Sequence, residues 1–216
     1  MVVPRGDRRR GYIVHLTSLA NIGSIWKQGR LLAQSKIPGE VEVDELGSAD
    51  IKSQRRDRPV RCSLGGAVAD YVPFYFCAKS PMLYFAHTNN PLSPFKGGQR
   101  QLVHLVSHVD VINNMGCSFV ITDRNAALGY ARQSEDLDEL DQMIDWTLQQ
   151  QTYWNNTAQE PDRMERRMAE FLVYEECTVD ALLELVVIDA DLQMRVLDTI
   201  DGYDHPEVRV DRGWYY

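Results

Sequence analysis

Four groups of side chains in this sequence have types and spacings that could carry chemistry on a phosphorylated ligand. His15, Leu16 and Thr17 follow a β-branched run and precede a helix-like pattern, so an imidazole and a hydroxyl stand at the end of a strand. Both groups could hydrogen-bond a ribose or an amide. The alternative is that His15 only satisfies the polar groups of a strand–helix junction.

The second group is a basic segment centred on Arg55 and Arg56, with Lys52, Arg58 and Arg61 around them. Forked guanidiniums bind phosphate oxygens in pairs, so a segment of this kind could grip a pyrophosphate or a nucleic-acid backbone. The alternative is the solvated face of a basic helix.

The other two groups combine apolar and ionisable side chains. Residues 70–84 interleave aromatic side chains with Lys79 and Ser80, as in proteins that stack the bases of single strands. Glu170 stands directly before the apolar residues 171–174, where burial could tune it as a base or let it stabilise a developing cation. The alternatives are an ordinary core strand and a charge that flanks a strand.

Several other kinds of site are not expected. The sequence has no G-x-S-x-G nucleophile motif and no Gly-rich phosphate loop. The four cysteines, Cys62, Cys77, Cys117 and Cys177, are too far apart for a C-x-x-C motif, and no histidine lies beside them at zinc-ligand spacing. We therefore expect a reduced protein without a metal.

Charge is distributed unevenly along the 216 residues, whose formal net charge is -8. That total argues against a partner as acidic as nucleic acid. However, residues 1–132 carry 17 basic and 10 acidic side chains, whereas residues 133–216 carry 6 and 21. The first 132 residues therefore sum to +7, and the excess of acidic side chains is confined to the last part of the sequence.

The elements that must position these groups read as one α+β domain over residues 1–216. A strand over 12–15 leads into a helix that Thr17 or Ser18 caps and Gly29 ends, and a loop plus helix follows over 41–58. Pro73 favours an edge or a bulge for the strand over 71–76. Later strands are expected over 102–109, 118–122, 171–174, 185–188 and 208–210, with helices over 136–148 and near 164–169.

Neither secretion nor a membrane span is expected. The basic start of the chain has no apolar run, and the most apolar stretch, residues 182–188, is short and interrupted by Glu184. We expect a cytoplasmic protein.

An ordered set of motifs resembles one family along almost the whole chain. His15-x-Thr17, Gly29-x-Leu-Leu-Ala, Ile51-Lys-x-x-Arg55 and Gly65-Gly66 come first. D-Y-V-P-F-Y-F with S-P-M-L-Y then follows over 70–84, F-V-I-T-D over 119–123 and A-E-F-L-V over 169–173. Together they resemble DarT, the toxins of DarT–DarG toxin–antitoxin systems.

The resemblance implies an ADP-ribosyltransferase-like fold, in which flanking helices and an NAD-covering loop-helix element over 37–57 surround a central twisted split β-sheet. It implies a toxin that transfers ADP-ribose from NAD to a base of single-stranded DNA, releases nicotinamide and blocks replication. NAD is consumed as the donor. A monomer is expected, with a DarG-type macrodomain antitoxin as partner.

The resemblance also implies roles for individual residues. It implies that His15, Leu16 and Thr17 bind the nicotinamide end of NAD, and that Ser24, Leu32 and Arg55 line the rest of the cofactor pocket. The predicted DNA contacts are Lys79, Ser80, Pro81, Met82, Leu83 and Tyr84. Residues 130–170 correspond to the family's substrate-recognition loop. The catalytic pair is Arg55 and Glu170.

The assignment of the catalytic pair involves two choices. Arg55 is preferred to Arg56 because the spacings from Ile51 and from Asp70 both select it. The family's arginine is given a proton-acceptor role, but a guanidinium stays protonated at any ordinary pH. We therefore expect Arg55 to orient the base and stabilise its anion, and Glu170 to take or relay the proton.

Thymidine N3 is a weakly acidic imide, and overall likeness favours the thymidine-directed branch of the family over the guanosine-directed one. Two other readings stay open: an NAD-dependent ADP-ribosyltransferase acting on RNA or protein, and a non-catalytic module that binds single strands.

Overall fold

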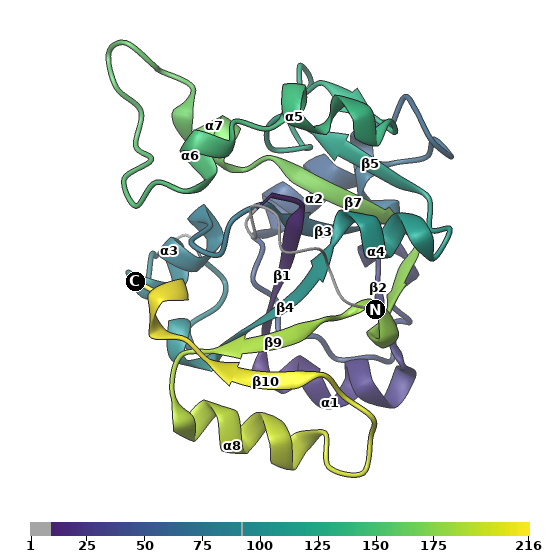
Figure 1. Ribbon diagram of the computed structural model, residues 1–216, viewed down its shortest axis with the longest axis vertical. Helices are drawn as coiled ribbons and strands as arrows, with labels where there is room; N and C mark the ends of the chain where they lie inside the picture. Colours follow the sequence, from purple (N-terminus) through teal and green to yellow (C-terminus); the bar gives the residue numbers. More distant parts are fainter. Residues whose placement is uncertain (1–9, 92) are drawn as a thin grey trace.

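The computed structural model describes residues 10–91 and 93–216. The basic residues within 1–9, which contribute to the expected positive half, lie outside this range. The described chain forms an eight-stranded sheet in the order β10-β9-β4-β1-β3-β7-β5-β6 and a separate two-stranded sheet of β2 and β8 (Figure 1). The strands are β1 (Tyr12–Ser18), β2 (Arg30–Leu32), β3 (Tyr71–Tyr75), β4 (Leu102–His108), β5 (Phe119–Thr122), β6 (Gln133–Ser134), β7 (Glu170–Tyr174), β8 (Glu176–Thr178), β9 (Glu184–Val187) and β10 (Glu207–Val210).

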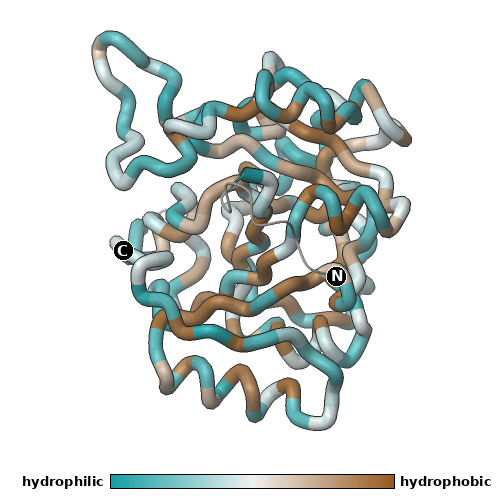
Figure 2. Tube along the Cα trace, in the orientation of Figure 1, coloured by the Kyte–Doolittle hydropathy of each residue, from teal (hydrophilic) through white to brown (hydrophobic). Residues whose placement is uncertain are grey.

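Eight α-helices in the described part of the chain flank these strands. They are α1 (Leu19–Gln28), α2 (Ala49–Asp57), α3 (Pro81–His87), α4 (Val109–Asn114), α5 (Leu140–Met143), α6 (Trp146–Gln149), α7 (Arg163–Arg167) and α8 (Ala190–Thr199). The expected α+β class and split central sheet are confirmed. Figure 2 shows hydrophobic stretches along the strands and hydrophilic ones in the outlying loops, including the long loop between α6 and α7. None of the helices in the described ranges is long and apolar enough to cross a membrane.

The sheet divides between β1 and β3, next to the residues of the candidate site. β1 pairs with β4 along its whole length, but with β3 only between Val14 and Tyr75. The prediction that Pro73 lies at an edge is wrong, because β3 lies between β1 and β7. Since β1 and β3 have already separated at Pro73, its missing N–H leaves no ladder bond unmade on that side.

Local signals set the first helix as predicted. Ser18 caps α1, its Oγ accepting a hydrogen bond from the backbone N of Ala20, and Gly29 ends the helix with a φ of 68°. The single helix predicted over 136–148 is instead a short turn followed by α5 and α6. The helix is interrupted between α5 and α6 because Asp145 caps the start of α6. Its carboxylate accepts a hydrogen bond from the backbone N of Leu148 at 3.0 Å.

Two apolar clusters support the site. The larger fills the space between the sheet and most of the helices. The smaller lies against β3, β5 and β7 and contains Val60, Val68, Tyr71, Val120, Ala126 and Leu172. It fixes the chain just after α2 and the loop just after β5, which both contribute to the candidate site.

Candidate active site

A buried ion pair joins the two residues that the sequence predicts as catalytic. An Nη1–H of Arg55, from α2, donates to Oε1 of Glu170 at 2.8 Å, and the two side chains are 12% and 3% exposed. Arg56, the other candidate, is exposed and makes no such contact. The choice of Arg55 is therefore consistent with the geometry.

Glu170 is held on both sides by the sheet and a neighbouring loop. It stands in one cross-strand row with Tyr75 on β3 and Thr122 on β5. Its Oε2 accepts from the backbone N of Ala126 at 2.8 Å, and its own backbone N donates to Oγ1 of Thr122 at 3.1 Å. These contacts hold the carboxylate in one orientation.

Burial determines the protonation of Tyr75 and leaves one nitrogen of Arg55 without a partner in the part of the chain that the structure describes. Desolvation, and then the negative charge of Glu170, raise the pKa of Tyr75, so its phenol stays protonated. One guanidinium nitrogen of Arg55, Nη2, is buried and has no partner among the described residues. A buried donor without an acceptor is costly, so this atom fits an anionic or carbonyl oxygen of a ligand.

His15 lies at the division of the sheet, with its Nδ1 2.8 Å from the carbonyl oxygen of Pro73. Burial, and to a smaller extent the charge of Arg55, lower the pKa of His15, whereas the Pro73 bond raises it. Because a carbonyl only accepts, the neutral ring carries its hydrogen on Nδ1 and leaves Nε2 as an acceptor. His15 is therefore a fixed acceptor beside Arg55.

Asn21, a residue that no sequence motif indicates, attaches the predicted NAD-covering segment, residues 37–57 (the covering segment), to α1. Its Nδ2 donates to Oγ1 of Thr17 at 3.1 Å and to the carbonyl of Asp44 at 3.0 Å, and its Oδ1 accepts from the backbone N of Asp44 at 2.8 Å. Thr17, a candidate ligand residue, thus lies where β1, α1 and the covering segment meet.

The remaining predicted ligand residues are more dispersed. The side chain of Leu16 is buried, and Ser24 Oγ accepts from Gln28 Nε2 at 2.8 Å on α1. Leu32 is on β2, paired with Glu176. Within residues 10–91 and 93–216, neither Ser24 nor Leu32 hydrogen-bonds to Arg55, Glu170 or His15, so their place in a cofactor pocket stays a prediction.

The predicted DNA-contact block is the start of α3. Ser80 caps this helix, its Oγ accepting from the backbone N of Leu83 at 3.2 Å, and Ser80, Pro81 and Leu83 are buried. Of the six predicted side chains, Lys79 and Met82 are half-buried and Tyr84 is exposed. Only these three offer side-chain surface to a ligand in this structure.

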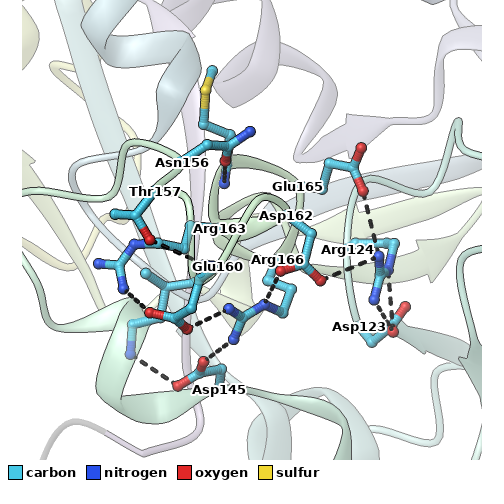
Figure 3. A network of polar contacts seen from close by, with 12 residues as sticks. Asp123, Arg124, Asp145, Asn156, Thr157, Glu160, Asp162, Arg163, Glu165 and Arg166 are labelled. Atoms are coloured by element: carbon cyan, nitrogen blue, oxygen red, sulfur yellow. Dashed lines mark hydrogen bonds and ion pairs between the residues drawn. The ribbon is translucent and has the colours of Figure 1, made fainter.

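An ionic network fixes the segment between α6 and α7, within the predicted recognition region (Figure 3). The guanidinium of Arg166 contacts three carboxylates, those of Asp145, Glu160 and Asp162. Arg124, from the loop after β5, pairs with Asp123 and Glu165. This region is therefore attached to the same loop whose Ala126 N–H holds Glu170. No group of three or more His, Cys, Asp or Glu side chains in the described ranges is arranged to hold a metal.

Arg58 links the end of α2, the helix that carries Arg55, to the loop that holds Glu170. It follows α2 one turn after Arg55, and its Nε donates to the carbonyl oxygen of Ala127 at 2.9 Å. The neighbouring Ala126 binds Glu170, so α2, Arg55, Glu170, this loop and Arg58 form a closed ring of contacts. Because α2 has no buried side chain of its own, polar anchors of this kind must hold it in place. The Arg55-x-x-Arg58 spacing could have indicated this role, but nothing in the sequence marks the backbone of Ala126.

We expect Arg58→Ala to lower kcat by ten- to a hundredfold or so, because loss of the anchor lets Arg55 drift from its position against Glu170. The Kd for NAD, measured by calorimetry, should rise by a smaller factor than kcat falls, because Arg55 is only one of the proposed contacts to the cofactor. The matched control is Arg56→Ala on the same helix, which should leave both values unchanged. Equal kcat values for the two variants would contradict a positioning role for Arg58.

Comparisons with known proteins agree on one family. The family model described as "ssDNA thymidine ADP-ribosyltransferase, DarT" matches residues 14–216. The DNA ADP-ribosyl transferase of Thermus sp. (strain 2.9) is 35% identical over 207 residues, which are 94% of this chain and 95% of that protein.

Solved structures agree as well. Thermus sp. 2.9 DarT in complex with ADP-ribosylated ssDNA matches with a TM-score of 0.87 and 33% identity, covering 95% of this chain and 96% of that one. The same enzyme in complex with NAD+ matches with a TM-score of 0.83 and 32% identity over all of both chains. This chain therefore belongs to the DarT family of single-stranded-DNA thymidine ADP-ribosyltransferases.

Proposed function

We propose that this protein transfers ADP-ribose from NAD to N3 of a thymidine in single-stranded DNA, with Arg55 and Glu170 as its catalytic residues. The observation that carries the proposal is the buried contact of 2.8 Å between these two side chains, at the point where the sheet divides. Membership of the DarT family, and the NAD+ and ssDNA complexes of the Thermus enzyme, support the donor and the acceptor.

NAD supplies an ADP-ribosyl group whose bond between ribose C1′ and nicotinamide breaks, and nicotinamide leaves with the bonding electrons. His15 Nε2 is suited to accept a hydrogen bond from the ligand, and the free Nη2 of Arg55 to donate one. Leu16, Thr17, Ser24 and Leu32 complete the proposed cofactor pocket. The covering segment, held by Asn21, lies over it and keeps water away from the reacting bond.

On the DNA side, Glu170 takes the proton from thymidine N3, and the freed electron pair of N3 forms the new bond to C1′. Arg55 donates to a carbonyl of the base and stabilises the negative charge that develops beside N3. The proton then passes from Glu170 to solvent. Lys79, Met82 and Tyr84 contact the strand, while Ser80, Pro81 and Leu83 support them from below.

In the cell we propose a cytoplasmic, monomeric toxin whose partner is a DarG-type macrodomain antitoxin. Modified thymidines would block replication until the macrodomain removes the ADP-ribose. The family's organisation into toxin–antitoxin systems supports this part of the proposal.

An acceptor competition tests the activity. Labelled NAD is offered together with single-stranded DNA, RNA and a protein mixture, and DNA oligonucleotides of single-base composition are then compared. We expect label in DNA only, and among the oligonucleotides only in those with thymidine. Label in guanosine-only DNA would assign the enzyme to the guanosine-directed branch of the family. Label in RNA or protein would overturn the assignment of DNA as the acceptor.

A further inference from the structure

A hollow opens beside the loop that holds Glu170. It has a volume of about 390 Å³, and Arg61 and residues 129–133 line it. Gly129 comes three residues after Ala126, and a Cβ added at Gly129 would lie 3.0 Å from an Nη of Arg58. The hollow is thus separated from the catalytic carboxylate by one short loop.

The cations around this hollow lack acidic partners in a protein whose net charge is -8. Eleven of the fifteen guanidiniums in residues 10–91 and 93–216 contact a carboxylate or a backbone carbonyl. The exceptions are Arg56, Arg61, Arg132 and Arg212. Two of these four, Arg61 and Arg132, line the hollow. Exposed cations left free at one place in an acidic protein indicate an anionic ligand there.

The backbone of the hollow is fixed although its guanidiniums are free. The backbone N of Arg61 donates to Oε1 of Gln133 at 2.8 Å, and Gln133 Nε2 donates to the carbonyl of Pro59 at 3.2 Å. The backbone N of Arg132 donates to Oδ1 of Asp123 at 2.9 Å. A ligand would therefore meet two cations whose attachment points are already in place, which lowers the entropy cost of binding.

Tyr130 adds an aromatic surface at the same place. Tyr130 is 61% exposed, its hydroxyl donates to Oε1 of Glu165 at 2.8 Å, and the guanidinium of Arg124 lies over the ring at 5.4 Å from its centroid. A ring that is held in place but largely exposed is suited to stack a base.

We propose that this hollow binds a nucleotide that flanks the target thymidine in single-stranded DNA. Arg61 and Arg132 contact its phosphates and Tyr130 stacks its base, which holds the strand while the target base approaches Glu170. This inference rests on the proposed function and assigns a DNA surface separate from α3.

The phosphate contacts are tested by measuring the Kd of a thymidine-containing oligonucleotide by fluorescence anisotropy over a salt series. We expect Arg61→Ala and Arg132→Ala each to weaken binding at low salt, and each to reduce the slope of log K against log salt by about 0.7. Arg212→Ala removes another unpaired arginine, in the turn Arg212–Trp214, and should leave the slope unchanged.

The stacking contact is tested with Tyr130→Ala, which should raise the Kd about tenfold, and with Tyr130→Phe, which keeps the ring and should stay within twofold or so. With an oligonucleotide that is abasic on both sides of the thymidine, Tyr130→Ala should have no effect. The Kd for NAD should be unchanged in all these variants, which shows that the catalytic site is intact.

Salt slopes for Arg61→Ala and Arg132→Ala equal to that of Arg212→Ala would overturn the proposal, as would an equal effect of Tyr130→Ala on normal and abasic-flanked DNA. This failure is distinct from failure of the proposed function, in which the unaltered protein itself would add no ADP-ribose to DNA.

Discussion

Replacing Glu170 with Gln should lower kcat for ADP-ribosyl transfer by about a thousandfold, within the range that general acid–base groups contribute. The amide has nearly the same shape but cannot take the N3 proton. It also has only one acceptor oxygen, whereas the carboxylate of Glu170 accepts from both Arg55 and Ala126. We therefore expect mass spectrometry to show the loss of DNA modification, while calorimetry shows that the variant still binds NAD.

The matched control for this variant is Glu176→Gln. Glu176 forms an ion pair with Arg30 in which both side chains are more than 40% exposed, and surface pairs of this kind contribute little. Its kcat should stay within about twofold of the unaltered protein. If Glu170→Gln kept a tenth or more of the activity, Glu170 could not be the group that accepts the proton.

Substituting Arg55 should affect stability and activity together. Arg55→Ala leaves the carboxylate of Glu170 buried without its cation, which costs about 3–5 kcal/mol in unfolding free energy. Arg55→Lys keeps the charge but loses the free Nη2, so we expect it to melt close to the unaltered protein while kcat/KM falls by about a hundredfold.

The comparison of the two Arg55 variants isolates the chemistry from folding, because only Arg55→Ala should shift the midpoint of urea unfolding strongly. Arg56→Lys is the control for charge-preserving change on the same helix. An Arg55→Lys variant as active as Arg56→Lys would mean that the ammonium suffices and that the forked guanidinium has no role in orienting the base.

Much of the fold could be predicted from local patterns. Ser18 and Gly29 bound α1 as capping rules require, and the apolar runs of β4, β5, β7 and β9 are strands as expected. Local patterns failed where a tertiary contact decides. Pro73 is tolerated inside the sheet because β1 and β3 have separated there, and the helical spacing over 136–148 breaks because Asp145 caps α6.

The candidate site divides in the same way. Arg55 and Glu170 could be selected because their ionisable side chains stand in motifs that resemble DarT. Ala126 binds Glu170 through its backbone N–H, a contact that leaves no mark on the sequence, and Asn21 acts between segments 23 residues apart. The uneven distribution of charge along the chain is also visible in the sequence. Only the structure shows that acidic residues pair with Arg163 and Arg166, whereas the guanidiniums of Arg61 and Arg132 have no acidic partner in the described ranges.

The most direct test of the account is mass spectrometry of a single-stranded oligonucleotide that contains one thymidine, after incubation with the protein and NAD. The account predicts a product heavier by one ADP-ribose, and no product from the same oligonucleotide carrying N3-methylthymidine, which has neither the proton that Glu170 takes nor a free N3. Equal modification of both oligonucleotides, or of neither while NAD binds normally, would contradict it.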